Sequence, residues 1–237
     1  MAQNDPIDEE RTYYDPEAVP NPSVWRQKRR LADAMRRVTE HMVLSDAPED
    51  ELSSAADALE RYADRLETHP KLVRTMGHPE AATSGNVAAF FDQSPIIGLA
   101  NPLAPPLSIA RSGELTARAT ATFGAAYEGP PGHVHGGWIA AAFDEVLGYV
   151  QSLGGNPGMT GRLTVHYRRP TPLHVELRFE ARLVREDGRK IFTEAQVFAG
   201  DTLTAESEGL FLSIPPERLA ALASEAVGAG SDGGESA

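Results

Sequence analysis

The residues best suited to chemistry lie in one short segment, which runs from His133 to Asp144 and reads His-Val-His-Gly-Gly-Trp-Ile-Ala-Ala-Ala-Phe-Asp. From Trp138 onward its residues are nearly all apolar, and a helix that is apolar all round is buried. Asp144 falls in the middle of this expected helix. A buried carboxylate is costly unless it is paired, and burial raises its pKa, so Asp144 is a candidate functional group. The alternative is that Asp144 faces solvent at one edge of the helix.

Gly136 and Gly137 lie where this helix should begin. The first N–H groups of a helix have no partner within the helix and carry the positive end of its dipole. Glycine also allows another group to approach the backbone closely. We therefore interpret these N–H groups as candidate donors to a carbonyl oxygen that is becoming an oxyanion. A plain strand-to-helix turn is the alternative.

His133 and His135 form a His-x-His pair, for which a metal site is one interpretation. A zinc or iron site needs further ligands, and the chain contains no cysteine. We predict no metal and no other cofactor, and we expect these histidines to bind substrate or to hold the turn. The lack of cysteine also excludes a disulfide framework and a cysteine nucleophile.

Helical periodicity covers roughly residues 22–44, and apolar residues from Leu52 to Leu66 mark a second helix. Asp46 is expected to cap the second helix and Pro48 to lie in its first turn. The first helix is rich in arginine and the second in acidic residues. This pattern favours an antiparallel helical hairpin of complementary charge over a phosphate-binding patch.

Strands are expected on both sides of the apolar helix. Alternation from Leu115 to Phe123 indicates one strand with a buried face, in a strand region that begins near residue 107. Four more strands should follow the helix, with Asp187-Gly188 and the turn at Gly200-Asp201 joining the last three. The order of elements predicts an α+β fold.

The chain divides into five expected parts. These are a flexible arm (1–21), a helical hairpin extension (22–69), an irregular connecting loop (70–106), an α+β domain (107–216) and a mostly disordered tail (217–237). A loop as long as the third part is usually functional or is pinned by a partner.

The segment His135-Gly136-Gly137, followed by Asp144, resembles the signature of hotdog-fold thioesterases, in particular the group related to 4-hydroxybenzoyl-CoA and phenylacetate-pathway thioesterases. Gly158-Met159-Thr160, the strand Val165 to Pro170 and the hairpin Glu186 to Lys190 are also similar, so the likeness covers roughly residues 107–214. It implies a hotdog fold, in which an antiparallel sheet wraps around a central helix, and hydrolysis of an acyl-CoA. A non-catalytic acyl-CoA binder and a hotdog dehydratase are the alternatives, because fold alone does not decide function.

The resemblance also implies roles. Asp144 would act as general base or nucleophile, and Thr160 would orient the attacking water. The N–H of Gly136 or Gly137 would polarise the thioester carbonyl, with His135 supporting that end of the site. Many relatives have an asparagine shortly before the histidine, but residues 127–134 contain none. His133 is the candidate replacement.

Helix geometry places a constraint on this site. Gly136 and Asp144 are eight residues apart, which corresponds to roughly 12 Å along a helix at about 1.5 Å per residue. They cannot both contact one carbonyl group, since catalytic contacts are about 3 Å long. Two antiparallel helices about a two-fold axis would remove the conflict, so we expect a homodimer, or a dimer of dimers, with shared sites.

Four basic side chains are candidates to bind the phosphates of coenzyme A: Arg168, Arg169, Arg189 and Lys190. Their alternative role is as solvated strand ends. The whole chain is acidic, with a formal net charge of −12, so we expect no nucleic-acid partner. The sequence has no apolar run long enough to cross a membrane, and its acidic N-terminus does not resemble a signal peptide. We therefore expect a cytoplasmic protein.

Overall fold

The computed structural model describes residues 22–70, 92–156 and 158–215. Helices α1 (Pro22–Leu44) and α2 (Glu49–Glu67) come first. Strands β1 (Ser108–Gly113) and β2 (Thr116–Thr122) precede helix α5 (Gly136–Ser152), with the short 3-10 helix η2 (Ala125–Tyr127) between β2 and α5. Four strands follow: β3 (Gly158–Tyr167), β4 (Glu176–Asp187), β5 (Lys190–Ala199) and β6 (Thr202–Ser213). The predicted order of helices and strands is confirmed. The expected arm and tail, and much of the connecting loop, lie outside the described residues.

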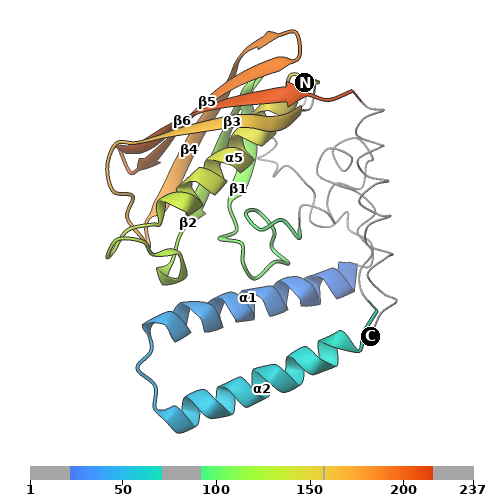
Figure 1. Cartoon of the computed structure of the whole chain (residues 1–237), viewed down its shortest axis with the longest axis vertical. Helices are drawn as coiled ribbons and strands as arrows, with labels where there is room; N and C mark the ends of the chain where they lie inside the picture. The colour runs from blue at the N-terminus through green and yellow to red at the C-terminus, as the bar shows by residue number, and fades with distance from the viewer. Residues whose placement is uncertain (1–21, 71–91, 157, 216–237) are drawn as a thin grey trace, which may run out of the picture.

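The six strands form one antiparallel sheet in the order β1-β2-β4-β5-β6-β3. Helix α5 lies against all six strands, and the sheet curves around it (Figure 1). This is the α+β hotdog arrangement that the resemblance implied. Strand β3 forms one edge of the sheet, with β6 as its neighbour, so its other side is open.

The core lies between α5 and the concave face of the sheet. Phe123, Phe143, Phe179 and Phe211 are almost fully buried there, and the rings of Phe143 and Phe179 meet edge to face with centroids 5.6 Å apart. Burial of such rings is a dominant favourable contribution to folding. Phe143 is therefore a packing residue.

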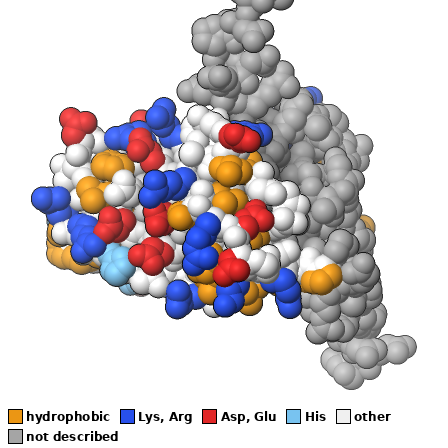
Figure 2. Space-filling view, turned by 90° about the horizontal axis from the view of Figure 1, so that it is seen from above, with side chains coloured by type: hydrophobic (Ala, Val, Ile, Leu, Met, Phe, Trp, Pro, Cys, Tyr) orange, Lys and Arg blue, Asp and Glu red, His pale blue; other side chains and the backbone are white. Residues whose placement is uncertain are grey.

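The opposite face of the sheet is charged. Cross-strand and neighbouring ion pairs join Arg168 to Glu206, Arg178 to Glu180, and Arg182 to Glu194. Viewed from above, the described surface carries basic and acidic side chains interspersed (Figure 2). Successive side chains of a strand point to opposite faces of the sheet. The strands therefore alternate between apolar residues, which face α5, and charged residues, which face outward.

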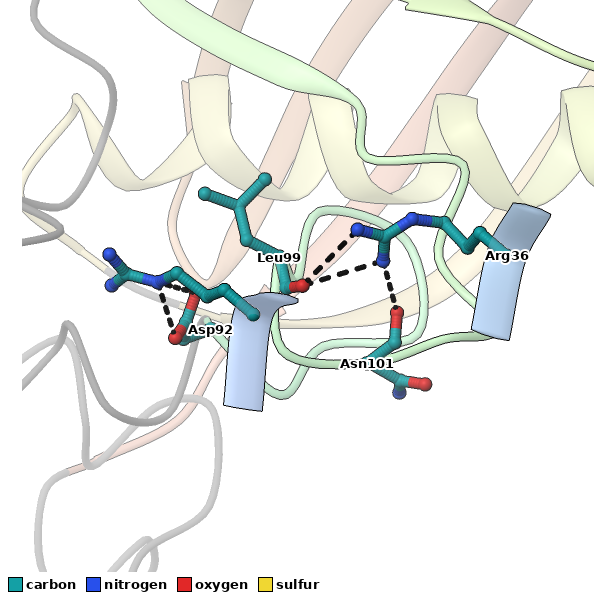
Figure 3. Close-up of polar contacts among 5 residues, drawn as sticks. Arg36, Asp92, Leu99 and Asn101 are labelled. Atoms are coloured by element: carbon teal, nitrogen blue, oxygen red, sulfur yellow. Dashed lines mark hydrogen bonds and ion pairs between the residues drawn. The ribbon is translucent and has the colours of Figure 1, made fainter. Parts of the chain in front are cut away.

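Helix α1 is docked on the hotdog domain through one of its faces. Trp25 and Ala32 are buried, and Arg29 Nε lies 2.9 Å from the fully buried carboxylate of Asp92. Arg36 donates to the carbonyl of Asn101 at 2.9 Å and more weakly to that of Leu99 (Figure 3). The described end of the connecting segment is therefore pinned by α1.

The second helix differs from the expectation in two respects. Pro48 occupies the N-cap position and no side chain caps the helix, so the predicted Asp46 cap is wrong. No residue of α2 is buried, and no ion pair joins α2 to α1 among the described residues. The two helices run antiparallel (Figure 1), but at least two of the α1 arginines, Arg29 and Arg36, bind the segment after residue 91 instead.

Candidate active site

The N-terminus of α5 is capped by a histidine. His135 has extended backbone angles, and its Nδ1 accepts the N–H of Gly137 at 3.0 Å. The cap satisfies one of the helix's unpaired donors. Because Nδ1 accepts, the proton of a neutral ring lies on Nε2, and the side chain as a whole is exposed. His135 therefore both fixes the start of the helix and offers a donor there.

Gly136 is left as the available donor. Its N–H meets no acceptor among the described residues, whereas that of Gly137 is held by His135. The hydroxyl of Tyr167 donates to the Gly136 carbonyl at 2.7 Å, and a Cβ at position 136 would lie 3.2 Å from that hydroxyl oxygen. The sequence did not distinguish the two glycines, but the hydrogen bonds favour Gly136 as the donor.

Asp144 and Thr160 are brought together, as the resemblance implied. Thr160 Oγ1 donates to Asp144 Oδ1 at 2.8 Å. The register of β3 shifts between Thr160 and Arg162, and such a bulge re-aims nearby side chains. Asp144 is exposed in the single chain, so of the two positions expected for it the solvent-facing one is confirmed and the buried one is not. The sheet covers only one face of α5, and Asp144 lies on an uncovered face.

Glu145 is a second carboxyl on α5, next to Asp144, and the sequence reasoning did not single it out. It is half-buried, and desolvation, assisted by the negative charge of Asp144, raises its pKa from 4.5 to about 7. The two side chains lie about 100° apart around the helix, so one is partly shielded while the other is open to solvent. Two adjacent acidic residues in an apolar helix were the available signal.

His133 has a local role in the turn. Its Nδ1 donates to the Pro131 carbonyl at 2.8 Å, and its backbone bridges to Pro172. These contacts shape the approach to α5. A contact of His133 with substrate stays a prediction.

The four predicted basic residues fall into two groups. Arg168 pairs with Glu206, and Arg169 donates to the Leu203 carbonyl at 3.3 Å, both just beyond the end of β3. Arg189 donates to the Ser213 carbonyl at 3.1 Å, and Ser213 pairs with Gly158 at the start of β3. Lys190, next to Arg189, is exposed. A ten-residue strand spans roughly 30 Å, so the two groups do not form one patch on a single chain.

The described part of the chain offers no group of three or more His, Asp or Glu side chains placed to hold a metal ion. Its helices are also too short or too polar to cross a membrane.

The chain is similar to known thioesterases in sequence and in fold. Residues 131–206 match the family model described as thioesterase superfamily. A crystal structure of a thioesterase superfamily protein is 35% identical, with a TM-score of 0.70, over 78% of this chain and 94% of the other. That likeness includes more of the chain than the α+β domain alone.

Curated relatives match over a shorter region. Acyl-coenzyme A thioesterase THEM4 of Xenopus laevis is 39% identical over 93 residues, which are 38% of this chain and 41% of the relative. The THEM4 of Bos taurus is 37% identical over 38% of each chain. The chain therefore spans about two fifths of the length of these relatives.

Proposed function

Because the chain belongs to the thioesterase superfamily, we propose that it hydrolyses the thioester of an acyl-coenzyme A to a carboxylic acid and free coenzyme A. The names of the THEM4 relatives support this substrate class. The observation that carries the proposal is the hydrogen bond between Thr160 and Asp144. It aligns the carboxylate of Asp144, on an exposed face of α5, with the hydroxyl of Thr160 on β3.

In the first route, Asp144 acts as general base. Thr160 occupies one carboxylate oxygen, Oδ1, and holds the group in one orientation. The other oxygen accepts a proton from water while the water oxygen attacks the thioester carbon. The C–S bond then breaks, and the coenzyme A thiolate takes up that proton.

In the second route, Asp144 attacks the thioester carbon itself, the C–S bond breaks and the coenzyme A thiolate leaves with a proton from solvent. Water then cleaves the resulting mixed anhydride into the product acid and free Asp144. A single turnover in ¹⁸O-labelled water separates the routes. The general-base route places ¹⁸O in the product acid. The nucleophilic route, with water attacking the Asp144 carbonyl, leaves the label in the protein during the first turnover.

The oxyanion is assigned to the N-terminus of α5. The free N–H of Gly136 and the dipole of the helix point to where the carbonyl oxygen gains charge. The Nε2–H of His135 lies at the same end of the helix and supplies a second donor. Tyr167 positions this turn through the Gly136 carbonyl.

The two halves of the site come from different subunits. Gly136 and Asp144 belong to one helix and lie too far apart for a common carbonyl. The open side of β3 carries unpaired N–H and C=O groups, which favour pairing with another strand. Antiparallel pairing of two β3 strands sets the Tyr167 end of one beside the Gly158 end of the other. Gly136 then faces Asp144 of the partner subunit, in a homodimer or a dimer of dimers.

The same pairing brings the separated basic residues together. Arg168 and Arg169 follow the Tyr167 end of β3, and Arg189 lies by the Gly158 end. Across the dimer these groups form one cluster that suits the phosphates of coenzyme A. Exposed Lys190 extends the cluster.

A panel of acyl-CoA esters tests the function, with release of free thiol as the readout. We expect turnover of at least one ester by the wild type and loss of turnover in Asp144→Asn, with an unchanged circular dichroism spectrum. Exposed Asp201 offers a control, because Asp201→Asn should keep wild-type rates. If Asp144→Asn keeps wild-type rates, the catalytic assignment is wrong. If the wild type binds acyl-CoA without turnover, the chain is a binding protein.

A further inference from the structure

An apolar groove of about 480 Å³ lies beside the N-terminus of α5. Its size falls in the range of small-molecule sites, which are lined mostly by apolar and aromatic side chains. One wall is α1, a second is the segment from Pro102 to Pro106, and the floor includes Tyr127 and Trp138. The N-terminal extension therefore completes a cavity that the hotdog domain alone would leave open.

Contacts within the described residues hold these walls in place. The rings of Tyr127 and Trp138 meet edge to face with centroids 4.9 Å apart, and the Tyr127 hydroxyl donates to the Leu103 carbonyl at 3.1 Å. Arg36 of α1 holds the carbonyls of Leu99 and Asn101 just before the wall (Figure 3). The groove is therefore built by tertiary contacts on three sides.

Most of the polar groups at the groove come from α1, and Thr122 of β2 adds one more. Arg36 is engaged by backbone carbonyls, and Glu40 accepts the N–H of Ala125 at 3.0 Å. Arg37, Thr39 and His41 line the α1 side, and most of the apolar contact surface lies on the opposite wall and the floor. Met35 and Leu103 nevertheless stay substantially exposed, as expected of a surface that binds an apolar group.

The groove adjoins the proposed oxyanion site. Trp138 lies about 200° around the helix from Gly136, so the groove opens on the other flank of the same helix end. The N–H of His135 donates to the carbonyl of Tyr127, in the groove floor, at 2.9 Å. A thioester whose carbonyl oxygen is bound by the Gly136 N–H can therefore direct its acyl chain across the helix end toward the Trp138 ring. We propose that this groove binds the acyl group of the substrate and selects apolar acyl groups longer than acetyl. This inference rests on the proposed function.

Filling the groove tests the assignment in the full-length protein. Met35→Trp and Leu103→Trp add bulk from opposite walls, and Met42→Trp adds the same bulk on α1 outside the groove. We expect the first two to lower kcat/KM for decanoyl-CoA by at least about tenfold, as pocket changes of this size do. Their kcat/KM for acetyl-CoA should stay within about twofold of wild type, and Met42→Trp should leave both values unchanged. Equal losses for both esters, or no loss with decanoyl-CoA, would overturn the proposal.

Direct binding separates this proposal from the proposed function. Titration calorimetry with sodium decanoate needs no turnover. We expect binding to the wild type and Met42→Trp, and at least about tenfold weaker binding to Met35→Trp. If no acyl-CoA is hydrolysed and decanoate still binds in this pattern, the thioesterase proposal fails and the groove assignment stands. If decanoate binds all three proteins equally, or none, the groove assignment fails.

Discussion

Thr160 donates a hydrogen bond to Asp144 across 2.8 Å, and this bond joins the bulged start of β3 to the middle of α5. The two residues are 16 positions apart in sequence and meet because β3 turns back along α5. The bond fixes one carboxylate oxygen and leaves the other to react. It therefore defines one half of the proposed site within a single chain.

Removal of the Thr160 hydroxyl should slow the reaction without unfolding the protein. We predict that Thr160→Val lowers kcat by about 10- to 100-fold, because the carboxylate and the water lose their orientation. Thr160→Ser should recover most of the rate, since it keeps the hydroxyl. Thr164→Val, on the same strand, is the matched control. Equal rates for the Val and Ser variants would show that the hydroxyl has no role.

The backbone N–H of Gly136 can be removed with little other change to the helix. Gly136 is the first residue of α5, and proline, which lacks a backbone N–H, is tolerated at that position. His135 already has the extended backbone angles that a residue before proline requires. We predict that Gly136→Pro lowers kcat by about 10²- to 10³-fold, the usual effect of losing one oxyanion donor. Gly136→Ala adds a Cβ at the same place and keeps the N–H, so it should retain much more activity. Similar losses in both variants would point to the Cβ contact with Tyr167.

A shared site can be tested by mixing two inactive variants. In a heterodimer of Asp144→Asn and Gly136→Pro, one site carries both substitutions and the other carries neither. Random pairing should therefore restore roughly a quarter of wild-type activity. Co-expression with two different tags, a thiol-release assay and sedimentation would measure this. A mixture that stays inactive despite forming heterodimers, or a fully active monomer, contradicts the shared arrangement.

Glu145 should make stability depend on pH. Its pKa is raised from 4.5 to about 7, mainly by desolvation and then by Asp144. Between these values the folded chain holds a proton that the unfolded chain has released, so the free energy of unfolding should fall as pH rises from about 4.5 to about 7. The loss is of the order of 3 kcal/mol at most.

Urea unfolding at several pH values measures this change. Glu145→Gln should flatten the decline, whereas Glu208→Gln on the exposed face of the sheet should preserve it. A Glu145→Gln protein with the wild-type slope would assign the pH dependence to other groups.

Much of the fold could be predicted because its patterns are local. Helical spacing between residues 22 and 44 predicted α1, and alternation from Leu115 to Phe123 predicted the buried face of β2. The order of strands and helix followed from the same periodicities. The Asp46 cap failed because a helix boundary depends on local backbone geometry that composition describes only loosely.

The sequence by itself determined which residue types are present for chemistry: one segment with His135, Gly136 and Asp144, and a later Thr160 that the resemblance singled out. Only the tertiary structure decided how they are used. Capping by His135 left the Gly136 N–H free, and the packing around α5 left Asp144 exposed and Glu145 half-buried. The docking of α1 formed the groove at Trp138. These outcomes depend on which surfaces meet across long sequence separations, and local residue patterns do not encode those contacts.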